Sequence, residues 1–426
     1  MISLPFCLII VVVLGFARGI LISNRVFEFP SLIGAISLIW LIPQALSLEL
    51  SSQRFEVDAS FWLYVAGCFL AAQIGFSFLA SSRVFGRGRG RSELNFERYQ
   101  TKTILGLLLV LLVIAYVSAV QTDAMKGVFG RQAWSGVITF WYTLGKLANV
   151  VLVVGLITYL KTKSRLAFVL AFLALSLLLE EGLGGLRREE LFNAGVLTLG
   201  AWSLVTKKAL PRTFLLFSIF SAFFVMNFAG LIRSNLETEN TSLIGYVFSG
   251  EASSLIQEIN VQSKLSDEIY LAHYDYKTTS QTGSVELGAT LVNKFTHRYV
   301  PGFIVGKDVK ESLKFDTYYS KLKGGQLAGE YSLGSTRTGF SDSFVNFYWA
   351  GWLLFLIIGT LLGRAYILGT AGSVYYLALY LLLLSAGIKA FTHDTAEFFA
   401  QAFFYYVVAR AFFRIARIRF LTDGKA

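Results

Sequence analysis

The feature that most constrains this chain is a series of long apolar runs that recur from one end of the sequence to the other. Runs of about eighteen or more apolar residues are long enough to cross the roughly 30 Å hydrocarbon core of a bilayer as helices. The composition agrees, since 55% of the residues are hydrophobic and only 15% are charged, whereas about a quarter are charged in a soluble domain. A membrane barrel would instead show alternating segments of about ten residues. The sequence therefore predicts an all-α, polytopic membrane protein.

The runs predict about eleven transmembrane helices. They lie near residues 2–22, 30–48, 61–80, 103–120, 137–160, 165–180, 190–206, 213–232, 343–365, 371–389 and 396–413. The first run has no basic segment before it and no small-residue cleavage site, which favours a retained helix over a signal peptide. The predicted organisation is helices 1 to 8 in residues 1–232, a large loop in 233–341, helices 9 to 11 in 342–413 and a basic tail in 414–426.

Basic residues in the short connections predict the orientation, because cytoplasmic loops carry an excess of Lys and Arg. With the spans above, all the basic clusters fall on one side of the membrane. They are Arg18 and Arg25; Arg83, Arg87, Arg89, Arg91, Arg98 and Lys102; Lys161, Lys163 and Arg165; Lys207, Lys208 and Arg212; and Arg410, Arg414, Arg417 and Arg419. That side is predicted to be cytoplasmic, with the C-terminus, and the N-terminus and the large loop are predicted to be outside. The same distribution argues against nucleic-acid binding, despite the net charge of +11.

The large loop is nearly neutral, with 11 basic and 12 acidic residues between positions 233 and 341. Apolar residues at helical spacing predict one amphipathic helix within residues 251–270 and a second across 285–295, which ends before Pro301. The loop is therefore expected to be folded and mainly helical.

Several basic side chains fall on the predicted outer side, where the charge rule disfavours them. Arg187 and Arg188 follow a glycine-rich turn and precede the seventh span, so a helix N-terminus and two guanidinium groups could bind an anion together. Alternatively, Glu189 and Glu190 simply neutralise them. Arg233 follows the eighth span, where it could also snorkel from a helix C-terminus.

Two further candidates lie in the large loop. His297 could act as a general base or hold a phosphate, with Arg298 beside it, although a loop histidine is often without a role. Arg337 lies in a turn rich in glycine and hydroxyl groups just before the ninth span, with Ser341 or Asp342 as the expected N-cap. This turn fits phosphate capture, or an ordinary return to the membrane.

Charged residues within or between spans are the remaining candidates. Lys146 lies near the middle of the fifth span, and His393 and Asp394 lie in the turn between the last two; such residues usually face a cavity or a partner. Cys7 and Cys68 lie in apolar runs and indicate neither a disulfide nor a zinc site. The chain has no nucleotide-binding motif and no convincing metal motif, so no cofactor or metal is expected.

Two of these stretches resemble motifs of one known family. The first is Gly184-Gly-Leu-Arg187-Arg188 followed by an apolar span, and the second runs from Arg337 to Trp352 and on into Gly359 and Gly363. They are similar to the turn that opens a mid-chain helix, and to the return to the membrane after the large loop, in the Wzy-type polymerases of bacterial surface polysaccharides. The plan of many spans with one large, late periplasmic loop also resembles that family.

The resemblance implies a glycosyltransferase of the bacterial inner membrane. It would move a growing glycan from undecaprenyl diphosphate onto a lipid-linked repeat unit at the periplasmic face, with a flippase and a chain-length regulator as partners besides the bilayer. Arginines would stabilise the departing diphosphate. The expected catalytic residues are His297, Arg187 and Arg337, and the expected substrate-binding residues are Arg188, Arg233, Arg298, Glu190 and Asp342.

Three other functions stay open at this point. The related O-antigen ligases share the architecture, but this chain has no clear copy of their histidine motif. A transporter or flippase of lipid-linked oligosaccharide would usually show internal repeats and short loops. A scaffold of the cell envelope would leave the outer arginines without a function.

Overall fold

The computed structural model describes residues 5–22, 25–50, 57–81, 100–129, 137–184, 188–211, 213, 267–317 and 337–418. Every regular element in these ranges is helical, as predicted. The eighth predicted span and most of the first predicted loop helix lie outside the described residues.

Nine described helices precede the large loop. They are α1 Pro5–Leu21, α2 Phe29–Ile39, α3 Leu41–Leu50, α4 Ala59–Ser81, α5 Thr101–Phe129, α6 Val137–Gly145, α7 Leu147–Thr162, α8 Arg165–Gly184 and α9 Arg188–Thr206. The described helices of the loop are α13 Asp267–Thr282, α14 Ala289–Tyr299, α15 Gly302–Val305 and α16 Lys307–Ser312. The last elements are α18 Gly339–Phe347, the 3₁₀ helix η4 Tyr348–Gly351, α19 Trp352–Thr370, α20 Val374–Thr392 and α21 Thr395–Ile418.

Seven helical segments in the described part of the chain are long and apolar enough to cross a membrane. They are Ala59–Phe78, Thr101–Met125, Val137–Thr162, Arg165–Leu183, Gly339–Thr370, Val374–Thr392 and Thr395–Arg417. Each corresponds to a predicted span, and two of them contain a break, at Lys146 and at η4. The apolar helices near the N-terminus, Phe6–Leu21 and Phe29–Ile39, are shorter. The length and hydropathy of these helices thus indicate a multi-pass, all-α membrane protein. The total of about eleven spans stays a prediction.

Small residues allow α4 and α19 to pack backbone against backbone. A Cβ atom at Gly359 would lie 2.1 Å from the carbonyl oxygen of Ala72, and one at Gly363 would lie 2.6 Å from that of Phe76. On the facing helix, a Cβ atom at Gly75 would lie 2.3 Å from the carbonyl oxygen of Leu356. Glycines four residues apart are a common way for membrane helices to approach closely.

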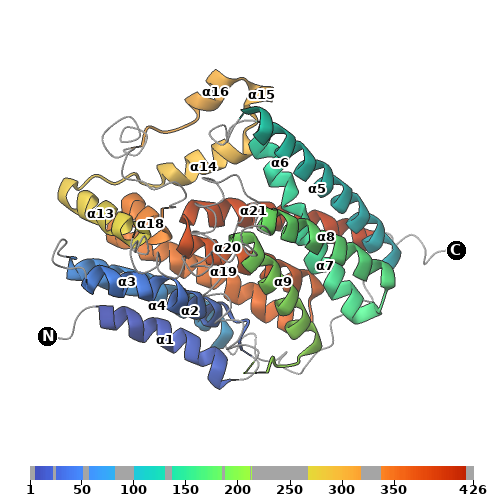
Figure 1. The fold of residues 1–426 in the computed structure, drawn as a ribbon, viewed down its shortest axis with the longest axis horizontal. Coiled ribbons are helices and arrows are strands. Elements are labelled where there is room, and N and C mark those ends of the chain that lie inside the picture. Colours follow the sequence, from blue (N-terminus) through green and yellow to red (C-terminus); the bar gives the residue numbers. More distant parts are fainter. Residues whose placement is uncertain are drawn as a thin grey trace, which may run out of the picture.

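One end of the helix bundle is covered by α13, α14, α15 and α16, and we call it the capped end; these helices lie along the upper left of Figure 1. The Trp40 indole N–H donates to Glu268 on α13 at 2.7 Å. The Tyr276 hydroxyl, also on α13, donates to Ser60 at the start of α4 at 2.7 Å. α14 packs against α6 and α21. The second loop helix predicted from the sequence is therefore present, as α14.

The other end of the bundle carries basic residues. α6 and α21 begin beside α14 at the capped end and run away from it, so the α7–α8 turn and the last turns of α21 lie at the far end (Figure 1). Basic residues of the described chain near this end include Lys161, Lys163, Arg165, Lys207, Lys208, Arg410, Arg414 and Arg417. The described basic residues of the short connections on which the predicted orientation depends thus lie together at this end, and the orientation itself stays a prediction.

Candidate functional site

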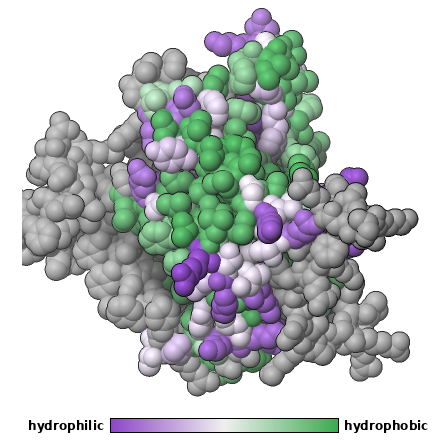
Figure 2. Space-filling view, turned by 90° about the vertical axis from the view of Figure 1, so that its right-hand side faces the viewer, coloured by the Kyte–Doolittle hydropathy of each residue, from purple (hydrophilic) through white to green (hydrophobic). Residues whose placement is uncertain are grey.

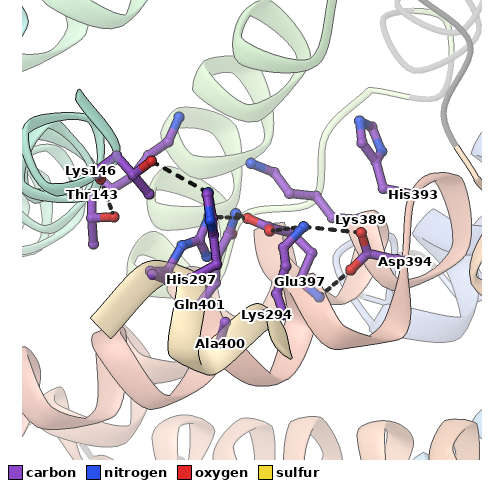
Figure 3. Close-up of polar contacts among 12 residues, drawn as sticks. Thr143, Lys146, Lys294, His297, Lys389, His393, Asp394, Glu397, Ala400 and Gln401 are labelled. Atoms are coloured by element: carbon purple, nitrogen blue, oxygen red, sulfur yellow. Dashed lines mark hydrogen bonds and ion pairs between the residues drawn. The ribbon is translucent and has the colours of Figure 1, made fainter. Parts of the chain in front are cut away.

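The loop helix α14 is held on the start of α21 by ion pairs. Lys294 Nζ lies 3.0 Å from a carboxylate oxygen of Asp394 and 3.0 Å from one of Glu397. Arg298 donates to Glu397 at 2.6 Å. One turn further, the Tyr299 hydroxyl donates to the Ala400 carbonyl oxygen at 2.5 Å. Figure 3 shows Lys294 and Glu397 pointing toward each other between the two helices. This docking brings two loop cations to the end of a membrane span.

The sequence explains why the carboxylates gather at the start of α21. Asp394 precedes the helix and accepts from the Glu397 backbone N–H at 2.5 Å, as an N-cap residue does. Negative side chains in a first helical turn also interact favourably with the helix dipole. N-capping and the helix dipole thus explain why Asp394 and Glu397 lie at the start of α21. The packing of α14 on α21 then brings Lys294 and Arg298 into contact with them.

A second set of ion pairs joins the start of α9 to α20 and to the α6–α7 break. Glu189 pairs with Lys389, and its carboxylate lies 3.1 Å from His393 Nε2. Glu190 accepts from Lys146, whose ammonium group also lies 4.5 Å from the centre of the Tyr142 ring. Both glutamates lie in the first turn of α9, where the helix dipole favours negative charge.

Together these residues form a charge-balanced group at the capped end, which we call the charged cluster. It consists of Lys146, Glu189, Glu190, Lys294, Arg298, Lys389, His393, Asp394 and Glu397. Among these described residues, four Lys or Arg side chains face four carboxylates, and His393 is additional. Figure 3 shows the side chains of α14, α20 and α21 that contribute to it. Such a concentration of charge next to membrane spans marks a functional site more often than a structural one.

Two groups in the turn between α20 and α21 have shifted pKa values. Burial lowers the pKa of His393, but the hydrogen bond and negative charge of Glu189 outweigh it, so the pKa of His393 is raised. Burial raises the pKa of the Asp394 carboxyl, and Lys294 offsets this only in part. The turn therefore holds a histidine and an aspartate that both bind a proton more readily than usual.

His297, also on α14, directs its ring toward α6 and makes no ion pair with these carboxylates. Its Nε2 is 3.4 Å from the Thr139 hydroxyl of α6, and its carbonyl oxygen accepts from Lys310 at 2.8 Å. Burial, and then the charges of Lys310 and its neighbours, lower the pKa of His297 to about 4. His297 is therefore neutral at neutral pH and poorly suited to take a proton there, although it can accept a hydrogen bond.

Asp342 links the re-entry helix α18 to α21. Its carboxylate accepts from the Thr395 backbone N–H at 3.0 Å and from the Thr395 hydroxyl, and the other oxygen accepts from Thr290 at 3.0 Å. The expected capping role was wrong, because α18 begins at Gly339 and its N-cap is Thr338, which accepts from the Ser341 N–H at 3.4 Å. The helix begins earlier than expected because the Thr338 hydroxyl, three residues before Ser341, caps it.

Arg337 lies next to α13 and apart from the ion pairs of the charged cluster. Its Nε is 3.2 Å from an Asp275 carboxylate oxygen and 3.1 Å from the Ser341 hydroxyl, which itself donates to Asp275. Of the other predicted residues, Arg187 and Arg233 lie outside the described residues, and Arg188 begins α9 with a side chain that is also outside them. The expected roles of these arginines at the diphosphate stay predictions.

Below the charged cluster, polar side chains continue toward the middle of the spans. Asn149 Nδ2 donates to the Tyr405 hydroxyl at 2.9 Å, and Asn193 Nδ2 lies 3.4 Å from Asn149 Oδ1. Three buried oxygens of this region, Glu190 Oε2, Asn193 Oδ1 and Gln401 Oε1, have no hydrogen-bond partner among the described residues. Buried polar atoms at membrane depth normally have a partner or line a hydrated space.

Sequence reasoning missed three members of the charged cluster, Lys294, Lys389 and Glu397. Lys389 and Glu397 lie within the predicted last two spans, and a charge inside an apolar run was the available signal. Lys294 had no such signal, because it lies in a nearly neutral loop. Among the described residues, no group of three or more His, Cys, Asp or Glu side chains is placed to hold a metal ion.

No family model, no curated protein and no solved structure matches this chain.

Proposed function

We propose that this protein is a membrane glycosyltransferase that lengthens a polysaccharide. It transfers a growing glycan from undecaprenyl diphosphate onto a lipid-linked repeat unit at the periplasmic face of the bacterial inner membrane. The observation that carries the proposal is the charged cluster, in which Lys294, Arg298 and Lys389 meet at the capped end, beside the membrane spans.

The reaction needs positive charge where the diphosphate departs. In the ion pairs described above, the partners of Lys294, Arg298 and Lys389 are all carboxylates. Phosphate oxygens make the same charge-assisted hydrogen bonds as carboxylate oxygens. A lipid diphosphate can therefore replace part of the carboxylate contacts without moving the cations far. Arg187 and Arg188 directly precede Glu189 in the sequence, which supports their role as further diphosphate ligands.

The acceptor sugar must be oriented for attack. His297 is neutral at neutral pH because burial and nearby cations lower its pKa to about 4, so it accepts a hydrogen bond from the acceptor hydroxyl more readily than a proton. Asp394, whose pKa is raised by burial, is a further candidate to accept the proton of that hydroxyl. Arg337, Arg233 and Asp342 support the glycan on the loop side, and Glu190 keeps Lys146 in place.

Glycan lengthening in proteoliposomes tests the proposal. The protein is reconstituted with an undecaprenyl-diphosphate-linked repeat unit, and chain length is followed on gels without any nucleotide sugar. We expect lengthening by the wild type and a loss of about 100-fold or more in Arg298→Gln, since removing one group that stabilises developing charge has an effect of that order. The matched control is Arg410→Gln, an exposed arginine on α21 far from α14.

The outcomes separate the parts of the proposal. A wild type that lengthens no glycan contradicts the proposed function. Lengthening that survives both Arg187→Ala and Arg337→Ala contradicts a role of these two arginines in binding the diphosphate, and leaves the cations of the charged cluster as the diphosphate site.

A transporter of lipid-linked oligosaccharide is the second candidate. The polar residues Asn149, Asn193 and Tyr405 favour it, because they continue the charged cluster toward the middle of the spans, where transporters bind their substrates. In the same vesicles, movement of the lipid-linked sugar across the membrane without any lengthening would support this function.

A further inference from the structure

The segment of residues 302–315, which contains α15 and α16, presents large apolar side chains to its surroundings. Its six large apolar residues are between 40% and 71% exposed. They are Phe303, Ile304, Val305, Val309, Leu313 and Phe315. Single exposed apolar residues are normal on proteins, but a contiguous group outside the membrane spans normally marks an interaction surface.

The exposure follows from the fold, because polar contacts hold the second half of the segment against α14. The Asn293 side chain donates to the Phe315 carbonyl oxygen at 2.9 Å and accepts from the Phe315 N–H at 2.8 Å. The Lys310 ammonium group is buried and donates to the His297 carbonyl oxygen at 2.8 Å. With Lys310 and Gly302 turned inward, the apolar side chains necessarily point outward.

The segment lies at the level where the spans leave the membrane. The Phe303 ring meets the Phe140 ring edge to face, with 6.0 Å between their centres. Phe140 is only three residues from the start of the span Val137–Thr162, about 5 Å along a helix. Phe140 is itself 38% exposed on the outside of the bundle. The apolar surface of the segment therefore continues that of a membrane span.

The figures agree with this placement. In Figure 1, α15 and α16 lie at the top of the molecule, next to α6. Figure 2 shows apolar residues beside hydrophilic ones at that same height, and a larger apolar area over the middle of the face that it presents. α15 and α16 thus extend the apolar surface of the bundle beyond the ends of the spans.

The charges of the segment indicate which kind of surface it contacts. Residues 302–315 contain Lys307, Lys310 and Lys314 with Asp308 and Glu311; Lys310 is turned inward, and Lys314 pairs with Glu311. The outward surface is therefore nearly neutral, and its six apolar side chains lie beside the exposed Lys307, Asp308 and Glu311. Such a surface fits insertion of apolar side chains at the lipid headgroup boundary more than electrostatic binding to anionic lipids.

We propose that residues 302–315 are an interfacial anchor, which inserts its apolar side chains into the lipid leaflet at the capped end and thereby holds α14 over the charged cluster. The anchor acts through Asn293 and Lys310, which tie the segment to the helix that carries Lys294 and Arg298. The anchor does not depend on the proposed function, because it rests on exposure and position alone.

Depth measurements in lipid nanodiscs test the insertion. Cys7 and Cys68, the two cysteines of the chain, are replaced, and a fluorescent probe is attached at Ile304→Cys or, as the matched control, at Glu311→Cys on the same segment. Ile304 is 71% exposed and the Glu311 side chain is 65% exposed. In neutral phosphatidylcholine brominated near the headgroup, we expect strong quenching and a blue shift at position 304, and several-fold weaker quenching at 311.

Two results would overturn the anchor. The first is a probe at position 304 that stays in water and is not quenched by the brominated lipid. The second is cross-linking between Ile304→Cys residues of two copies in one nanodisc, which would assign the surface to a second copy of the chain.

Deuterium uptake of α14 tests the link to the charged cluster. We expect Ile304→Ser/Val309→Ser to raise uptake in residues 289–299 several-fold in nanodiscs. Leu287→Ser is the control, because Leu287 is 77% exposed just before α14 but outside the segment. Unchanged uptake in the double variant would show that α14 is held without the anchor.

Discussion

Lys146 and Lys389 are both almost fully buried in the charged cluster, and Lys146 lies at the break in a membrane span. It lies between α6 and α7, its side chain is 6% exposed, and its partner Glu190 is 2% exposed. In such a pair the cost of removing each charge from water can equal or exceed the attraction between them. The pair is therefore weak evidence for stability, and its retention in the protein fits a functional role for the two charges.

A double-mutant cycle on Lys146 and Glu190 measures the desolvation cost of the two charges against their attraction. We expect Lys146→Met alone to lower the free energy of unfolding by about 3–5 kcal/mol, because it leaves Glu190 charged and buried without its partner. Lys146→Met/Glu190→Leu should recover most of that loss, since two apolar side chains leave no buried charge without a partner. Unfolding in mixed micelles measures both values, with Lys208→Met, an exposed lysine, as the control. A double variant as unstable as the single one would contradict this account.

At the scale of elements, the contact between α4 and α19 depends on backbone proximity. Gly359 faces the carbonyl oxygen of Ala72 and Gly75 faces that of Leu356, so each helix provides the space that the other fills. α19 follows α18, whose Asp342 binds the start of α21. The packing of α19 on α4 thus helps to position α18 and its Asp342 beside the start of α21.

Two Gly→Ala substitutions, both within helices, distinguish the effect of close backbone packing on stability from the effect of helix propensity. We expect Gly359→Ala to destabilise the protein by about 1–3 kcal/mol, as overpacking does, because the new Cβ atom would lie 2.1 Å from the Ala72 oxygen. Gly67→Ala on α4 has no atom within 4 Å of its new Cβ, so it should stabilise by about 0.5–1 kcal/mol through helix propensity. Thermal unfolding in detergent compares the two, and equal effects would argue against backbone proximity as the cause.

At the scale of the whole molecule, the sequence predicted what depends on local hydropathy. Each of the seven long apolar segments corresponds to a predicted span, because span length and hydrophobicity are properties of consecutive residues. The break at Lys146 and the partners of Lys294 were not predictable in this way. Lys294 and Asp394 are 100 residues apart, and only the packing of α14 on α21 brings them together.

The orientation of the whole fold is open to direct measurement. Basic residues gather at the far end of the bundle, so we expect the capped end to face the periplasm. In a chain without Cys7 and Cys68, Ser284→Cys near α14 and Lys208→Cys after α9 are both at exposed positions. A membrane-impermeant maleimide should label Ser284→Cys in cells whose outer membrane alone has been opened, and Lys208→Cys only after the inner membrane is also opened. The reverse pattern would place the charged cluster on the cytoplasmic side, where transfer from a lipid-linked glycan already moved to the outer leaflet is impossible.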